Sequence, residues 1–472
     1  MKLRSAALAT LLLGLPATNY ADSLGRVYEL ALKNDYQFQR AKAMYQADAE
    51  LATIARAGLL PKIKADYTVR NVQEDSIIRQ LITPAAGSLV ETDVSLNRDV
   101  TDSGWQIKLE QPVFDAPAWY GYKQGKSEAL IASTLFEKAK QDLVLRVVNS
   151  YLNVLRAQDN LAAARAQERA FAGQLQKTQQ RFDTGLIPVI DVTESQSAFD
   201  LVAVRTLEEA INVEVALEEL ATLTGEEHQV LNLLRGDFVV RAPEPNDVDQ
   251  WAQAAGSDNL QVIAARHTQA AAKDKRKAAK WEHSPTLTFG AFASSVNTSG
   301  TNDSSIVSPF ILAPDQESDT FGLELRLEIP LYEGGATSAN RRRAEHLYQA
   351  SRNFVSETRR KATIQSRQLF LTVKSDMLRI EGRRSSILSA KAALDAAEAG
   401  YSIGTRNIVD VLNAQNTLFS AERDYANSRY DYIENSFRLR ATSASLSSGD
   451  LYRLDAFLNP PSNQQATQRI VR

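Results

Sequence analysis

The chain contains two copies of one short segment, and each copy follows a long sequence with helical character. The copies are Phe182-Asp-Thr-Gly-Leu-Ile-Pro-Val-Ile-Asp-Val and Tyr401-Ser-Ile-Gly-Thr-Arg-Asn-Ile-Val-Asp-Val, with an aromatic residue, a glycine, an aspartate and a valine at the same offsets. A glycine just after a helix supplies the left-handed residue that ends it. We therefore expect an internal duplication, with Gly185 and Gly404 in the turns of two helical hairpins.

Two long proline-free runs, residues 118–182 and 336–402, contain apolar residues at helical spacing. The stripes are Val144, Val147, Val148, Tyr151, Leu152 and Leu155 in the first run, and Phe370, Val373, Met377, Ile380 and Ile387 in the second. A helix of such a run is about 100 Å long, whereas the mean helix of a globular protein has about 11 residues. From the helices alone, a coiled-coil scaffold is an open alternative.

Four short segments alternate between apolar and polar residues, which predicts strands with one apolar and one wet face. They are residues 62–70, 105–110, 287–293 and 321–329. The polar connections 71–104 and 297–319 are expected to be exposed loops. A soluble half-buried sheet would alternate in the same way. Charges of both signs on the polar faces, and helices too long to cover a sheet, favour strands in a membrane.

Prolines stand where helix and strand are expected to meet, at Pro61, Pro112, Pro285 and Pro330. Four strands cannot close a membrane barrel by themselves, since the smallest single-chain barrels need about eight. An open edge in lipid leaves backbone groups unpaired at several kcal/mol each. If the strands lie in a membrane, several chains must therefore contribute to one barrel.

The first 21 residues have the layout of a bacterial secretory signal: two basic residues, an apolar run, and small residues up to Ala21. They carry two cations and no anions, so their removal changes the net charge from −3 to −5, which argues against a nucleic-acid partner. There is no cysteine, so neither disulfides nor a lipid-bearing cysteine contributes. No later apolar segment reaches the roughly 18 residues of a membrane-spanning helix.

The segments 400–412 and 181–192, together with the signal and the two helix-strand-strand-helix halves, resemble the TolC family of outer-membrane efflux and secretion channels. The resemblance implies an α+β membrane protein of the cell outer membrane. In it, three protomers give four strands each to one twelve-stranded transmembrane β-barrel, which continues as a long α-helical periplasmic tunnel.

The same resemblance divides the chain into four parts. They are a signal peptide at 1–21, a first outer-membrane efflux protein repeat at 22–232, a second repeat with an equatorial segment at 233–446, and a C-terminal tail at 447–472. It implies a homotrimer in outer-membrane lipid, with a periplasmic adaptor (membrane fusion) protein and an inner-membrane pump or ABC exporter as partners.

The resemblance also implies a gating latch between the two hairpins. Asp191 of the first hairpin corresponds to an acceptor for Tyr401 and Arg406 of the second, and both side chains can donate to a carboxylate. The family's threonine beside that aspartate is Ile190 in this chain, so one side-chain acceptor is missing.

Asp410 corresponds to a selectivity ring of three carboxylates across the closed entrance, which favours cations. A second ring three residues further on is lost, because Asn413 stands there. From the residues alone, the simpler alternative is that Asp191 and Asp410 are first-turn acids that stabilise helix starts.

Sequence motifs for enzymatic chemistry are weak. The four histidines, His228, His267, His283 and His346, have no metal-ligand spacing, and neither a phosphate-binding loop nor a nucleophile elbow occurs. We expect no catalytic residues, no cofactor and no metal site beyond the Asp410 ring. A passive duct powered by its partners is the main hypothesis, and a periplasmic coiled-coil adaptor or stalk without a pore is the alternative.

Overall fold

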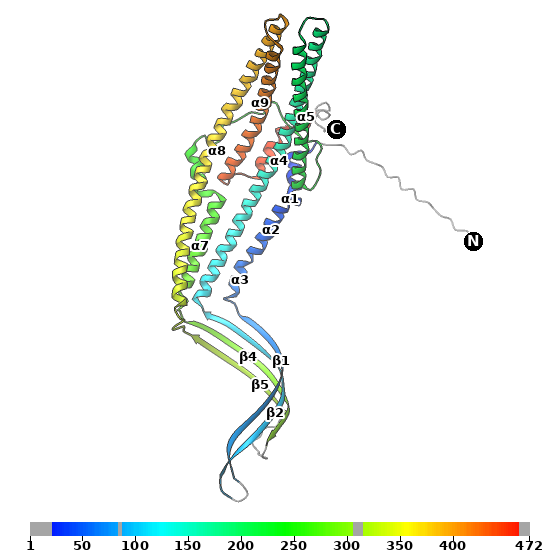
Figure 1. Ribbon diagram of the computed structural model, residues 1–472. Coiled ribbons are helices and arrows are strands. Elements are labelled where there is room, and N and C mark those ends of the chain that lie inside the picture. The colour runs from blue at the N-terminus through cyan, green and yellow to red at the C-terminus, as the bar shows by residue number, and fades with distance from the viewer. Residues whose placement is uncertain (1–20, 84–86, 305–314, 462–472) are drawn as a thin grey trace, which may run out of the picture. The chain divides into compact units, whose positions relative to one another are not determined.

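The computed structural model describes residues 21–83, 87–304 and 315–461 (Figure 1). The predicted signal therefore lies outside the described residues except for Ala21, and so does the end of the tail, residues 462–472. The described chain divides into two compact units. The first comprises residues up to Tyr45, Ser133–Ala264 and the chain from Ser356, and the second comprises Gln46–Ala132 and Ala265–Val355.

Long helices and an antiparallel sheet make up the described chain. The helices are α1 (Leu24–Asn34), α2 (Tyr36–Ala49), α3 (Leu51–Ala57), α4 (Ala116–Asp183), α5 (Val189–Thr224), α6 (Val248–Asp258), α7 (Leu260–Lys280), α8 (Ala336–Ser402), α9 (Ile408–Thr442) and α10 (Ser448–Asp455). The strands are β1 (Lys62–Ile82), β2 (Val90–Phe114), β3 (Leu233–Leu234), β4 (Thr286–Ser304), β5 (Gln316–Glu328) and β6 (Leu458–Asn459).

The two long helices are confirmed almost to the residue as α4 and α8, because nothing in either run breaks the helical hydrogen bonds. All six residues of the predicted α4 stripe are buried, and Phe370, Val373 and Ile380 of α8 are buried too. With α1, α5, α9 and α10 they form the core of the first unit. Tyr151 is fully buried and its hydroxyl donates to the carbonyls of Asp22 (3.1 Å) and Asn232 (2.8 Å).

Two arginines of α4, which lie outside its apolar stripe, are half-buried ion-pair donors. Arg156 donates to Asp431 of α9 at 2.8 Å, and Arg146 pairs with Asp35 at the end of α1. Since such pairs connect helices far apart in sequence, the polar face of α4 also takes part in packing.

The second unit contains a four-stranded antiparallel sheet in the order β1-β2-β4-β5 (Figure 1). The four predicted strands are confirmed, but each is longer than predicted. The prediction of exposed loops at 71–104 and 297–319 is wrong in large part, because the strands extend into both segments. β1 continues to Ile82, β2 begins at Val90, β4 continues to Ser304 and β5 begins at Gln316. Residues 305–314 of the second connection lie outside the described chain.

Polar side chains stabilise the part of the sheet that the alternation rule missed. Arg70 pairs with Asp102 at 3.0 Å, and Arg79 pairs with Asp93 at 3.0 Å, each across β1 and β2. Cross-strand pairs of opposite charge stabilise neighbouring strands, so a strand can continue through a polar segment. Such pairs depend on the register and cannot be predicted from the sequence of one strand alone.

The register brings the predicted apolar residues of all four strands to one face of the sheet. One row consists of Ile63, Leu109, Ala291 and Leu323, and the next of Ala65, Ile107, Ala293 and Phe321. This face is exposed in the single chain; Phe321, for example, is 74% exposed. Phe292, which breaks the alternation, lies over its cross-strand partner Gly322, where a Cβ would come within 2.4 Å of the ring.

No helix in the described part of the chain is long and apolar enough to cross a membrane.

A buried carboxylate joins α8 to α9 in the first unit. Asp376 is 1% exposed, accepts a hydrogen bond from Asn435 Nδ2 at 2.7 Å, and lies 3.1 Å from Arg379 Nη1. Burial raises the pKa of Asp376 above its ordinary value, and Asn435 and Arg379 only partly offset this. The charged form is therefore disfavoured in the folded state.

We expect Asp376→Asn to raise the midpoint of thermal unfolding at pH 7 by about 2 °C. A carboxyl group whose pKa is higher in the folded than in the unfolded state lowers the stability of the protein as the pH rises above the unfolded-state pKa. The gain in stability from Asp376→Asn should therefore vanish near pH 4. Thermal unfolding followed by circular dichroism measures it. Asp395→Asn, an exposed acid on the same helix, is the control and should change little. A lower midpoint for Asp376→Asn at pH 7 would contradict this account.

Candidate gate at the helical hairpin turns

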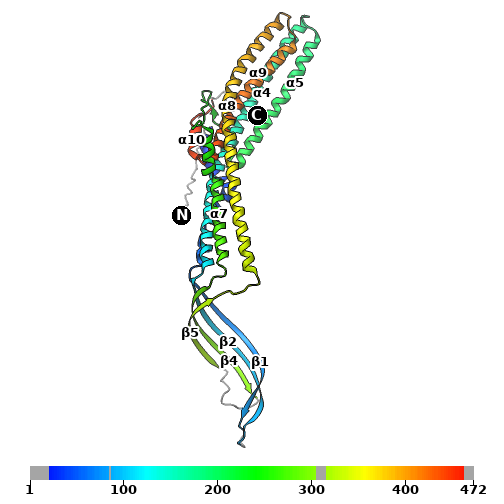
Figure 2. The same ribbon diagram turned by 90° about the vertical axis from the view of Figure 1, so that its left-hand side faces the viewer.

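The duplicated segments form two turns of the same backbone conformation at the same end of the first unit (Figure 1; Figure 2). Gly185 and Gly404 have positive φ angles of 76° and 79°. The nitrogens of Gly185 and Leu186 donate to the carbonyls of Phe182 (2.8 Å) and Arg181 (2.9 Å). Each turn therefore satisfies the last carbonyls of its helix by a Schellman motif, as the glycines predict.

The second turn repeats this bonding residue for residue. The nitrogen of Gly404 donates to the carbonyl of Tyr401 at 3.2 Å, and that of Thr405 donates to the carbonyl of Gly400 at 2.9 Å. The equal offsets of the aromatic residue and the glycine thus encode equal turns.

The aspartates of the duplicated segments lie in the first turns of α5 and α9. Pro188 and Asn407 are the N-caps, and the Asn407 side chain accepts from the nitrogen of Asp410 at 2.9 Å. Both acids thus stand where the partial positive charge of a helix start stabilises them. The simpler interpretation of these aspartates agrees with the structure, and only contacts beyond their own helix can add a second role.

The two hairpins pack against each other through a small apolar cluster near the turns. It consists of Phe171 of α4, Val202 of α5, Ala397 of α8 and Ile408, Val411 and Leu412 of α9. Since burial of each large side chain contributes about 1.5–3 kcal/mol, this cluster holds the hairpins together next to the turns, in addition to the larger core of the unit.

Tyr401 of α8 contacts both helices of the other hairpin. Its hydroxyl lies 3.5 Å from Asp191 Oδ2 of α5, which is the long limit of a hydrogen bond. The guanidinium of Arg181 of α4 lies 4.8 Å from the centre of its ring, within the range of a cation–π interaction. The structure therefore brings together two of the three predicted latch residues.

The pKa of Tyr401 is raised above its ordinary value, first by burial and then by the negative charge of Asp191. Arg181 and a hydrogen bond with Thr178 act in the opposite direction. Because the raised pKa keeps the phenol protonated at neutral pH, Tyr401 is a hydrogen-bond donor under ordinary conditions.

A buried pair of hydroxyls joins α4 to α5 below this contact. Ser195 Oγ lies 3.3 Å from Thr178 Oγ1, which in turn donates to the carbonyl of Gln174 at 2.9 Å. Sequence reasoning missed Thr178 and Ser195, since a small polar residue on a helix has no pattern of its own. Arg181 directly precedes the duplicated aromatic position, which is a signal that could have identified it.

Arg406 does not reach Asp191 within one chain. Its side chain lies across Gly400, where a Cβ would come within 3.0 Å of Arg406 Cγ. Among the described residues it forms neither an ion pair nor a side-chain hydrogen bond with Asp191. Ile190, beside that aspartate, is exposed. Of the predicted latch, a single chain therefore contains only the contact between Tyr401 and Asp191.

Asp410 is half-buried on α9, and Asn413 is exposed one turn further along. Each chain supplies one such carboxylate, so the predicted ring depends on further copies. Within the described part of one chain, no group of three or more acidic, histidine or cysteine side chains could hold a metal ion.

We expect Gly404→Ala to destabilise the second turn by about 1 kcal/mol, because alanine is strained at a positive φ angle. Gly382→Ala, in the interior of α8 with open space around the new methyl group, is the matched control and should stabilise by up to about 1 kcal/mol. Denaturant unfolding of the purified protein measures both. Equal effects of the two substitutions would mean that the turn conformation differs from the one described.

Comparison with known proteins shows relatives over nearly the whole chain. The model of the family described as "Outer membrane efflux protein" matches residues 27–226 and 251–445. "Outer membrane protein TolC" of Vibrio cholerae serotype O1 is 30% identical over 456 residues, which cover 96% of this chain and 97% of that protein. "Alkaline protease secretion protein AprF" of Pseudomonas aeruginosa is 28% identical, covering 90% of this chain and 85% of the relative.

Among solved structures, CusC, whose structures are described in terms of transmembrane channel formation, superposes with a TM-score of 0.73 at 17% identity, covering 90% of this chain and 93% of that one. That likeness supports the fold of long helices with an attached sheet. Because the family model spans most of the sequence in two matching halves, the chain belongs to the outer membrane efflux protein family and is an outer-membrane channel protein.

Proposed function

We propose that three copies of this chain form one passive duct across the outer membrane, with a tunnel of long helices in the periplasm. The observation that carries this proposal is the open sheet with an exposed apolar face. Within the described residues, β1 pairs only with β2 and β5 only with β4, so each outer edge is free. Lipid does not tolerate free edges, and three sheets of four strands joined edge to edge would remove them.

The proposed cargo follows the names of the relatives. TolC and AprF are an outer-membrane protein and a protease secretion protein, which supports both efflux and type I secretion for this chain. We infer that a periplasmic adaptor and an inner-membrane pump or ABC exporter dock on it and supply the energy.

We further propose that the Tyr401–Asp191 contact is a latch that keeps the hairpins together at the periplasmic end. It joins α8 to α5 next to the apolar cluster, so separating the hairpins must break it. Since Arg406 lies on its own turn in a single chain, its proposed acceptor is Asp191 of a neighbouring copy. Asp410 of each copy would then contribute to a ring at the same entrance.

Replacing Tyr401 with Phe and Arg406 with Ser should increase single-channel conductance in a planar bilayer. Loss of a hydrogen bond worth about 1 kcal/mol changes the balance of closed and open states about fivefold. Tyr425→Phe, which removes a hydroxyl from α9 away from the turns, is the control and should leave conductance unchanged.

Trimer assembly of the Tyr401 and Arg406 variant, followed by native electrophoresis, should equal that of the unmodified protein. Unchanged conductance in an intact trimer would place the latch elsewhere, whereas a monomeric unmodified protein without ion current would refute the duct itself.

The single carboxylate ring predicts weak block by multivalent cations, and Asn413→Asp should strengthen it. The new carboxylate would lie three residues from Asp410 on the same face of α9, so that trivalent cations meet two rings. We expect the half-blocking concentration to fall about tenfold. Asp410→Asn is the companion variant and should weaken block in both backgrounds. Equal block with Asn and Asp at position 413 would exclude this position from the ring.

A further inference from the structure

A cavity of about 230 Å³ lies between residues 241–251 and the helices α9 and α10 of the first unit. Three arginines, Arg241, Arg440 and Arg453, are among the residues that line it. Neither the latch nor the sheet uses these residues. Three arginines around one small cavity repel one another unless something negative lies between them.

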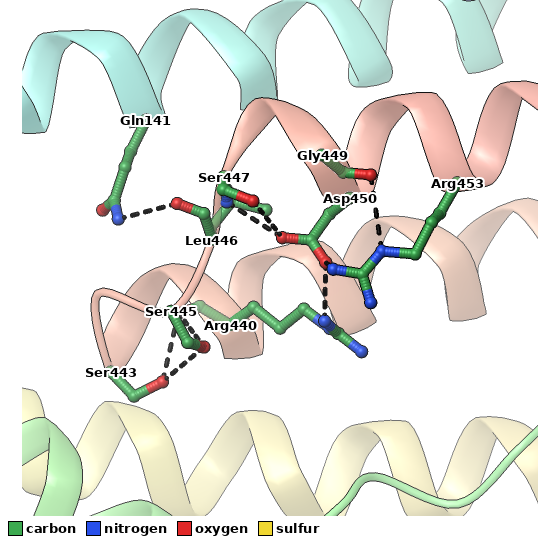
Figure 3. A network of polar contacts seen from close by, with 9 residues as sticks. All are labelled: Gln141, Arg440, Ser443, Ser445, Leu446, Ser447, Gly449, Asp450 and Arg453. Carbon is green, nitrogen blue, oxygen red and sulfur yellow. Dashed lines mark hydrogen bonds and ion pairs between the residues drawn. The ribbon is translucent and has the colours of Figure 1, made fainter.

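A buried carboxylate fixes two of the three arginines (Figure 3). Asp450 is 6% exposed, and its Oδ1 accepts from Arg440 Nη1 at 2.6 Å and lies 2.9 Å from Arg453 Nη2. Its other oxygen accepts from the backbone nitrogen of Ser447 at 2.9 Å, so the acid is itself immobilised by the start of α10. The two guanidiniums are thus held before any ligand arrives.

The third arginine is held by its backbone rather than by its side chain. The hydroxyl of Tyr432 accepts from the nitrogen of Arg241 at 3.0 Å and donates to its carbonyl at 2.6 Å. Trp251, which also lines the cavity, donates from Nε1 to the carbonyl of Pro245 at 2.7 Å. The guanidinium of Arg241 has no hydrogen bond or ion pair within the described residues, so its donors are available.

The charges around the cavity do not cancel. Glu244 is the acidic residue of the wall and Asp450 lies behind two of the arginines, which leaves one net positive charge.

We propose that this cavity binds a phosphate group, either free or as a phosphate monoester on a soluble solute or a lipid head group. A guanidinium presents several N–H donors in a planar fork that matches phosphate oxygens. Three guanidinium forks offer more donors than a planar carboxylate with two oxygens can accept, whereas a tetrahedral oxyanion has four oxygens. Because Asp450 holds Arg440 and Arg453, only the exposed side chain of Arg241 must be ordered on binding. The proposal is independent of the duct and its latch.

The test is thermal unfolding of the purified full-length protein in detergent, titrated with inorganic phosphate at constant ionic strength and compared with chloride. Phosphate should raise the unfolding midpoint saturably, as a ligand of the folded state does. Arg241→Gln should raise the half-saturating concentration about tenfold, because a charged hydrogen-bond donor is lost. Arg384→Gln, an exposed arginine on α8, removes the same charge and should leave phosphate binding unchanged.

Since the Arg241 side chain is exposed and forms neither a hydrogen bond nor an ion pair within the described residues, the midpoint of Arg241→Gln without phosphate should equal that of the unmodified protein. Glycerol 3-phosphate as a second probe separates the sources: tighter binding than phosphate indicates a head group, and weaker binding indicates a free anion. A phosphate effect no larger than that of chloride, or an unchanged response of Arg241→Gln, would overturn the proposal.

Discussion

The free backbone edges of β1 and β5 are the constraint on which the rest of this structure depends. The sheet has one apolar face that a single chain leaves exposed, and two edges whose N–H and C=O groups have no partner in the described residues. In water such edges invite aggregation, and in lipid each unpaired group costs several kcal/mol. The proposed association with identical sheets would resolve both problems at once.

The contacts between the hairpins suit the proposed gate, which must close and also open. The Tyr401–Asp191 distance of 3.5 Å corresponds to a weak hydrogen bond, so the proposed latch adds little to the packing of the neighbouring apolar cluster. A partner that separates the hairpins at this end would therefore mainly have to offset the burial of that cluster.

The sequence predicts those features that depend on local chemistry. The bounds of α4 and α8 follow from runs without proline, and both turns follow from glycines that accept a positive φ angle. The sequence underestimates the extent of the sheet, because the stabilising pair of Arg70 and Asp102 can be recognised only when the register of β1 and β2 is known. For the same reason Thr178 and Ser195 escaped notice: their contact joins two helices, and neither residue marks it alone.

The divergence of the two copies explains how a contact such as the proposed latch can form between two turns of the same backbone conformation. If the second copy were identical to the first, it would carry a phenylalanine at position 401. A phenylalanine opposite Asp191 could not donate a hydrogen bond. The copies have diverged where this matters: Phe182 of the first corresponds to Tyr401 of the second, which adds the hydroxyl that reaches Asp191. Arg181 corresponds to Gly400, so a cation lies over the tyrosine ring in one hairpin, while the other leaves room for Arg406 across its own turn. The shared backbone thus comes from the common origin of the halves, and the bond between them comes from their differences.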